Sequence, residues 1–454
     1  MTFPNRLLNI TWVIPAEPAA PSRLARWYRT SLVGHPAGRD FRQLWIGDTI
    51  SQVGTQIGTI ALPLLAVSVL GADEFEMGLL ATFQHLAFLV VGLPAGAWVD
   101  RMRKRNVLIA GDLVRGVALL SLPLAWLAGV LTFPLVLAVA TVIGVATVFF
   151  DVAYQSYLPS LVPSSRISEG NAKLQVSHSV AQVAGPGLGG VLVRALGAPL
   201  VILVDAVSFL ASAVFVLRIR HRDERAPGND RRALHVEIGE GLGFVFRQPL
   251  LRRIVATTGA SNLFGGISNA LLVLYAIRDL GVGEAGLGLA LSVGAIGGLA
   301  GALLAGPLIR LVGEGRTIAL ALLPGLPALA LVPLAAGHSR PVAIAMLAAS
   351  TAVVGVGIVV YNVAQVSFRQ RLCPRRLLGR MNASVRFVVW GTMPVGAFLG
   401  GIIGSEYGVL TAFWVGVAGQ ALGALPVLLS PLVRMRDLPR HLDEHADTEP
   451  APQS

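Results

Sequence analysis

Ionisable side chains inside long apolar stretches are the residues of this sequence best suited to chemistry. A charge at such a place is costly without a partner and is typically retained for a function. A carboxyl group there can bind a proton when it is desolvated and release it when it meets water or a cation. Asp48 and Asp151 suit this role best, because each lies near one end of its apolar stretch beside polar or aromatic neighbours.

Other buried charges allow a structural role. Asp112 and Arg115 are three residues apart, so on a helix they share a face and can form an ion pair. Asp205 and Arg386 also lie within apolar stretches and are further candidates for buried charge.

Amide and aromatic side chains in the same stretches could line a cavity for an organic molecule. A mostly apolar wall with a few polar points suits amphipathic compounds. Hydrogen bonding between helices is the alternative role for the polar members of this set. The candidates are Gln52, Gln56, Gln84, Asn262, Phe264, Asn269, Tyr361, Asn362 and Trp390.

The elements that must position these residues are membrane-spanning helices. The 454-residue chain is 54% hydrophobic and only 13% charged, whereas a soluble domain carries about 25% charge. A bilayer core requires roughly 20 apolar residues per helix, and twelve stretches qualify. We therefore expect an all-α polytopic membrane protein with spans at 43–70, 77–99, 106–129, 131–154, 170–195, 198–218, 252–277, 284–309, 317–337, 341–366, 378–404 and 408–432.

The cations alternate from loop to loop. The loops after the even-numbered spans are rich in Arg, whereas the loop at 71–76 is acidic. By the positive-inside rule, both termini lie in the cytoplasm and the protein is multi-pass in the cytoplasmic (inner) membrane. The net charge of +11 is then mainly a topology signal, and no nucleic acid partner is expected. The predicted parts are a cytoplasmic arm at 1–40, a six-helix bundle at 41–218, a basic linker at 219–250, a second bundle at 251–433 and a cytoplasmic tail at 434–454.

The two predicted bundles share sequence. The segment from Gly185 to Gly190 has a counterpart from Gly396 to Gly401, 211 positions later, and Asn171-Ala172 recurs as Asn382-Ala383 at the same offset. Six spans per half return the chain to the same side, so the repeats are parallel. Two parallel halves around a central cavity are typical of one class of secondary transporter.

One loop resembles the signature loop of the major facilitator superfamily, written G-x-x-x-D-R-x-G-[RK]-[RK]. The matching residues are Gly96, Asp100, Arg101, Lys104 and Arg105, and the later glycine of the pattern is replaced by Arg103. The resemblance implies a close helix contact at Gly96. It also implies that Asp100 caps a helix start in the other half, near span 11, and latches one conformation. Simple topological charge is the alternative.

A second motif, formed by Gly185, Pro186, Gly189 and Gly190, resembles the antiporter motif of drug–proton exporters in this superfamily. Small-residue packing is its alternative explanation. The stretches 41–47, 150–163 and 379–386 look like the enterobactin-exporter and macrolide-efflux branch. This resemblance implies efflux of drugs, antibiotics or siderophores, driven by the proton gradient, and a charge network of Asp100, Arg101, Arg105 and Asp151.

No feature of the sequence indicates an enzyme. Cys373 is the only cysteine, which excludes a disulfide framework and a multi-cysteine metal site. No zinc motif, P-loop or nucleophile elbow is present, so we expect no cofactor and no metal. The sequence predicts an exporter working as a monomer by alternating access, with a small-molecule substrate, protons and the lipid bilayer as partners. An importer or lipid flippase on the same fold, or a non-transporting membrane receptor or scaffold, remain as alternatives.

Overall fold

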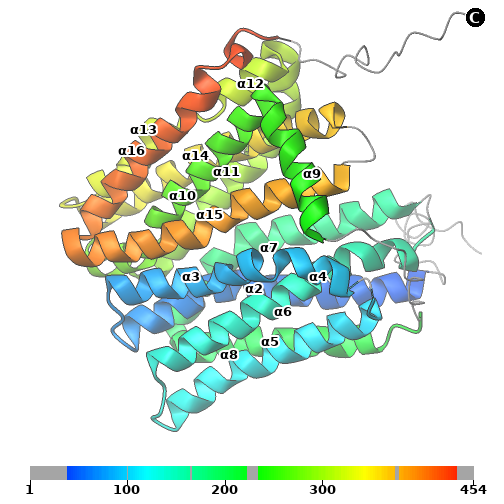
Figure 1. Cartoon of the computed structure of the whole chain (residues 1–454). Helices are drawn as coiled ribbons and strands as arrows, with labels where there is room; N and C mark the ends of the chain where they lie inside the picture. The colour runs from blue at the N-terminus through cyan, green and yellow to red at the C-terminus, as the bar shows by residue number, and fades with distance from the viewer. Residues whose placement is uncertain (1–37, 100, 164–165, 222–233, 374–377, 437–454) are drawn as a thin grey trace, which may run out of the picture.

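A computed structural model describes residues 38–99, 101–163, 166–221, 234–373 and 378–436, and these form two helical bundles (Figure 1). The first bundle contains α2 (Arg39–Ser68), α3 (Glu74–Val90), α4 (Gly92–Val99), α5 (Lys104–Leu127), α6 (Phe133–Leu161), α7 (Ile167–Leu196) and α8 (Ala198–Leu217). The second contains α9 (Leu234–Arg247), α10 (Pro249–Arg278), α11 (Gly283–Val312), α12 (Glu314–Leu320), α13 (Gly325–Leu334), α14 (Arg340–Leu372), α15 (Leu378–Tyr407), α16 (Val409–Leu428) and the 3₁₀ turn η3 (Pro431–Val433).

The predicted fold class is confirmed: the described part of the chain is helical, and eleven of its helical segments are long and apolar enough to cross a membrane. The second predicted span, 77–99, is not among these eleven, because it is divided into α3 and α4, which are 17 and 8 residues long. Pro94 has no N–H to bond the carbonyl at the end of α3, which accounts for the break near Val91. The predicted ninth span is likewise divided into α12 and α13 just before Gly325.

The two halves use the same backbone device to join their last two spans. Gly197 lies between α7 and α8 with φ +85°, and Gly408 lies between α15 and α16 with φ +87°. A positive φ costs glycine nothing because it has no Cβ. These two positions share the offset of 211 seen in the sequence repeat.

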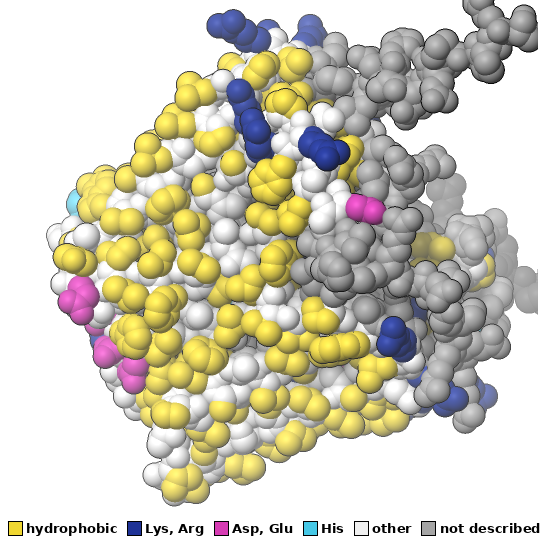
Figure 2. All heavy atoms as spheres, viewed as in Figure 1, with side chains coloured by type: hydrophobic (Ala, Val, Ile, Leu, Met, Phe, Trp, Pro, Cys, Tyr) yellow, Lys and Arg dark blue, Asp and Glu magenta, His cyan; other side chains and the backbone are white. Residues whose placement is uncertain are grey.

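Charge divides the molecule into two ends (Figure 2). Acidic side chains gather at one end of the visible face, Lys and Arg lie toward the other, and hydrophobic side chains cover the surface between them. We name the first the acidic end; its loops and helix starts carry Asp73, Glu74, Glu76, Asp279 and Glu284. The opposite end, where α2 and α5 begin and α11 ends, is the basic end.

The bundles meet along α3 with α15 and α7 with α11, and their axes diverge toward the basic end (Figure 1). At the acidic end, Arg278 of α10 donates hydrogen bonds of 2.9 and 2.7 Å to the carbonyls of Gly71 and Ala72. The Gly187 amide of α7 donates to Ser292 Oγ of α11 at 2.8 Å. The contact between halves is therefore built chiefly at the acidic end.

Candidate functional site

A buried ion pair lies at the centre of the first bundle. Arg115 Nη2 of α5 contacts Asp112 Oδ1 at 2.6 Å, as the spacing predicted. The guanidinium carbon lies 4.1 Å from the ring centre of Phe150 and 4.3 Å from that of Phe209, so two aromatic faces enclose the cation. The pair is structural in form, because its two members come from one helix and meet within one bundle.

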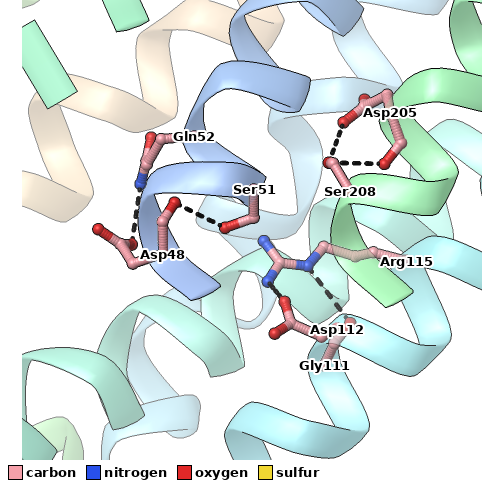
Figure 3. A network of polar contacts seen from close by, with 8 residues as sticks. All are labelled: Asp48, Ser51, Gln52, Gly111, Asp112, Arg115, Asp205 and Ser208. Carbon is pink, nitrogen blue, oxygen red and sulfur yellow. Dashed lines mark hydrogen bonds and ion pairs between the residues drawn. The ribbon is translucent and has the colours of Figure 1, made fainter. Parts of the chain in front are cut away.

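Asp48 of α2 lies beside this pair and is 4% exposed. Its carboxylate accepts hydrogen bonds from Gln52 Nε2, at 3.4 Å, and from the Tyr154 hydroxyl of α6. Figure 3 shows the Arg115 guanidinium pointing toward the helix that carries Asp48. The role of Tyr154 was not predictable from the sequence, because it depends on how α2 packs on α6.

Asp205 of α8 is held against the backbone of α2. Its side chain is 5% exposed, and Ser208 Oγ lies 3.4 Å from Oδ1 (Figure 3). A Cβ added to Gly54 would lie 2.8 Å from Asp205 Oδ1, and one added to Gly58 would lie 3.0 Å from Asp205 Cγ. The carboxyl group thus occupies space that only glycine leaves free. Gly54 and Gly58 were not among the predicted site residues, although their i, i+4 spacing is a signal of close helix packing.

Asp151 of α6 faces the other half of the molecule. It lines a cavity of about 190 Å³ together with Arg386 and Trp390 of α15 and Phe88 of α3. Arg386 is exposed, so the prediction of a buried charge at this position is wrong. Its guanidinium attracts the Asp151 carboxylate electrostatically. The rings of Phe88 and Trp390 pack at 5.2 Å between centres across the same interface. A carboxyl and a cation from different halves therefore share one partly apolar cavity.

A second cavity, of about 320 Å³, lies within the second bundle. Four predicted cavity residues line it: Asn262, Asn269, Tyr361 and Asn362. Three of these are already engaged in hydrogen bonds. Asn262 Nδ2 donates to the Val389 carbonyl at 2.8 Å, the Tyr361 hydroxyl lies 2.8 Å from Thr258 Oγ1, and Asn362 Oδ1 accepts from Gln365 Nε2 at 3.3 Å. Met393 and Gln420, which were not predicted, also line this cavity.

Other predicted cavity residues serve packing instead. Phe264 lies against Gly419 of α16, and Gln56 lies against Gly185 of α7. Gln52 bonds Asp48, and Gln84 lines neither of the two cavities described above. Helical periodicity could not distinguish these packing residues from cavity-lining ones. In a two-bundle protein, a polar helix face can point either to a neighbouring helix or to a cavity.

Comparison with known proteins identifies the family. The family model described as Major Facilitator Superfamily matches residues 44–389. The chain belongs to the Major Facilitator Superfamily. It is therefore a transporter and not an enzyme.

Relatives within the superfamily cover most of the chain. The multidrug efflux pump Tap of Mycolicibacterium fortuitum is 26% identical over 396 residues, covering 85% of this chain and 94% of that protein. An uncharacterized MFS-type transporter, y4rN, of Sinorhizobium fredii is 27% identical over 400 residues, covering 86% and 94%.

Solved structures of the superfamily share the fold. A bacterial homologue of the iron transporter ferroportin, in an inward-facing state, superposes with a TM-score of 0.68 at 18% identity, covering 86% of this chain and 98% of the other. The nucleoside transporter NupG superposes with a TM-score of 0.70 at 13% identity, covering 86% and 99%. Identities this low show the fold alone.

The described residues of the loop that resembles the superfamily's signature have separate partners and do not form one cluster. Asp100 lies outside the described residues, and Arg101 is exposed. Lys104 donates to the Ser156 carbonyl at 3.3 Å and Arg105 to the Leu217 carbonyl at 2.7 Å. No heavy atom lies within 4 Å of a Cβ built on Gly96, so the close helix contact expected there is not made in this conformation.

The expected network of Arg101 and Arg105 with Asp151 is wrong for the described residues. Asp151 interacts instead with Arg115 and Arg386. The reason is the length of α6, which continues to Leu161 rather than ending near residue 154. Ten helical residues place Asp151 about 15 Å inside that end.

The antiporter-like motif is a packing element between the two halves. A Cβ on Gly189 would lie 3.1 Å from the Ile57 carbonyl oxygen of α2. Gly190 lies against α11, where a Cβ would be 3.1 Å from Gly288 Cα, and the Pro186 carbonyl faces that same glycine. The motif thus lets α7 touch a helix of its own half and a helix of the other half at once.

Proposed function

We propose that this protein exports small amphipathic organic molecules from the cytoplasm in exchange for protons, by alternating access. One observation carries the proposal: Asp151 and Arg386, from different halves, line a single cavity with aromatic side chains. The similarity to proteins named multidrug efflux pumps supports the direction and the substrate class.

The charges suit proton exchange. Asp48, Asp112 and Asp205 are buried in the first bundle, where Arg115 is the one buried cation among the described residues. One cation cannot neutralise three buried carboxylates, and an unpaired buried charge costs several kcal/mol. This imbalance favours proton binding by the group, and Asp48 and Asp151 are the proposed carriers.

Protonation would alter the attraction between halves. A charged Asp151 attracts Arg386 across the cavity, which draws α6 toward α15. A protonated Asp151 loses most of that attraction, so Arg386 becomes available and the halves can separate. A ligand shifts a conformational equilibrium only by the difference between its affinities for the two states. Exchange therefore requires that substrate and proton favour different states.

The orientation follows from charge. The basic end would face the cytoplasm by the positive-inside rule, with both termini on that side of the inner membrane. The contacts at the acidic end then close the outer side, so the described conformation is open to the cytoplasm.

Transport into everted membrane vesicles tests the proposal. Uptake of a panel of amphipathic dyes, with and without an imposed pH gradient, is compared for the wild type, Asp48→Asn and Asp151→Asn. Glu406→Gln, an exposed acid near the acidic end, is the matched control. In both variants we expect dye uptake with the pH gradient to fall to the rate measured without it. We expect the variants still to bind the dye. Wild-type, gradient-dependent uptake in both variants would refute the coupling assignment.

Direction needs its own assay. Right-side-out and everted vesicles together separate export from the import and flippase alternatives, because only an exporter accumulates dye in the everted preparation against its gradient.

A further inference from the structure

The second bundle carries an apolar cavity that belongs to neither site described above. Its volume is about 370 Å³, within the range of small-molecule sites. The walls come from three segments of one bundle. They include Leu308 and Val312 of α11, Leu320 and Ala321 at the end of α12, and Val353 and Val356 of α14.

The cavity opens to the membrane side of the bundle. No residue of the first bundle lines it, so it is not part of the interface between halves. Residues 353, 356 and 360 of α14 face it, whereas residues 354, 358, 361 and 362 of the same helix line the 320 Å³ cavity. Its rim is exposed, with Val353 at 38% and the adjacent Leu311 at 75%. Exposed apolar side chains on membrane-spanning helices contact lipid tails.

One charge stands at the mouth of the cavity. Among its described lining residues only Arg316 is charged. The hydroxyl group of Thr317, which also lines the cavity, already donates to the Gly313 carbonyl at 2.7 Å. Arg316 is exposed in the first turn of α12, at the basic end. The nearby acid Glu314 is paired with Arg371, so it does not neutralise Arg316.

The depth of the cavity matches an acyl chain. On α14 the lining extends from Val353 to Val360, seven residues, which corresponds to roughly 10 Å of helical rise. A cation at the membrane edge above an apolar slot is the chemistry that recognises an anionic lipid headgroup with its tail below.

We propose that this cavity binds one acyl chain of an anionic membrane phospholipid, with the headgroup phosphate held by Arg316. The lipid lies between α11, α12 and α14, beside the break in the ninth span. The site is independent of the proposed direction of transport and of its substrate.

Native mass spectrometry of the purified full chain tests the site, with lipid retention counted after exchange into detergent containing phosphatidylglycerol, phosphatidylcholine or inorganic phosphate. Val353→Trp fills the cavity. Val363→Trp is its matched control, because Val363 is on the same helix and 39% exposed but does not line the cavity. Arg316→Gln removes the charge, and Arg310→Gln, at another exposed arginine outside the cavity, is its control.

We expect the wild type and both controls to retain one phosphatidylglycerol, and Val353→Trp to lose it. Arg316→Gln should bind it roughly tenfold more weakly, because a charge-assisted hydrogen bond is lost. Phosphate alone should not bind. Equal retention in Val353→Trp and Val363→Trp, or equal preference for both lipids in the wild type, overturns the proposal. If Val353→Trp does not fold, the comparison of phosphatidylglycerol retention between Arg316→Gln and Arg310→Gln tests the proposal.

Discussion

Gly190 of α7 and Gly288 of α11 place the backbones of the two halves in direct contact: a Cβ built on Gly288 would lie 3.1 Å from Gly190 Cα. The second bundle repeats the arrangement, because a Cβ on Gly401 of α15 would lie 2.9 Å from Gly78 Cα of α3. Two glycine contacts, related by the sequence repeat, therefore close the acidic end.

Adding one methyl group at this contact should open the acidic end. In Gly288→Ala the new Cβ would collide with the Pro186 carbonyl, and such overpacking costs about 1–3 kcal/mol. We expect about a tenfold shift away from the closed state and a comparable loss of transport. Electron–electron double resonance between spin labels at Val130→Cys and His338→Cys, in a Cys373→Ser background, measures the shift.

Gly265→Ala is the matched control for that substitution, because no heavy atom lies within 4 Å of its Cβ. Both changes add the same helix propensity, so only the contact differs. A similar distance distribution in the two variants would show that the glycine contact does not hold the halves together.

The close contact between Asp205 and Gly58 should appear as an energetic coupling in a double-mutant cycle. Gly58→Ala places a methyl group against the Asp205 carboxyl and should lower stability by about 1–3 kcal/mol. Asp205→Ala removes the obstacle, so the double variant should recover most of that loss. Thermal unfolding of all four proteins in detergent completes the cycle, with Gly92→Ala as an open-space control. Additive effects would mean that the two groups do not touch.

The ion pair in the first bundle should matter most for folding. Arg115→Met leaves Asp112 without its cation, and breaking a buried pair costs about 3–5 kcal/mol. We expect little monodisperse protein by fluorescence-detected size exclusion. Adding Asp112→Asn should restore part of the yield, because no uncompensated charge remains. If Arg115→Met elutes like the wild type, the pair is dispensable.

The closed acidic end should respond to pH through Asp279, which follows α10 outside the membrane-spanning segment. Partial burial raises the pKa of Asp279, the nearby Glu74 raises it further, and Arg278 opposes the shift. The closed arrangement therefore binds this proton more tightly than an open one, so its contribution to closure is present at low pH and is lost as pH rises through the raised pKa.

Asp279→Asn should make the spin-label distance at the acidic end less dependent on pH, and should favour closure at high pH. The comparison with Glu406→Gln isolates the effect from other acids that titrate in the same range. An unchanged pH profile in Asp279→Asn would remove Asp279 from this role.

Much of the architecture could be predicted because it depends on local composition. A helix that crosses a bilayer needs a long apolar run wherever it packs, so the helix boundaries expected around Ala198 and Arg340 agree with α8 and α14 within a few residues. The pairing of Asp112 with Arg115 was also predictable, because a spacing of three fixes a shared helix face.

The order of residues by itself determined that these segments are helices in a membrane, which of them repeat, and that Asp112, Arg115 and Asp205 are buried. Only the tertiary structure decided what each charge meets: Arg386 beside Asp151 across the two halves, and two glycines of α2 around Asp205. The physical reason is that apolar periodicity specifies which face of a helix avoids lipid. It contains no information on which of several neighbouring helices covers that face.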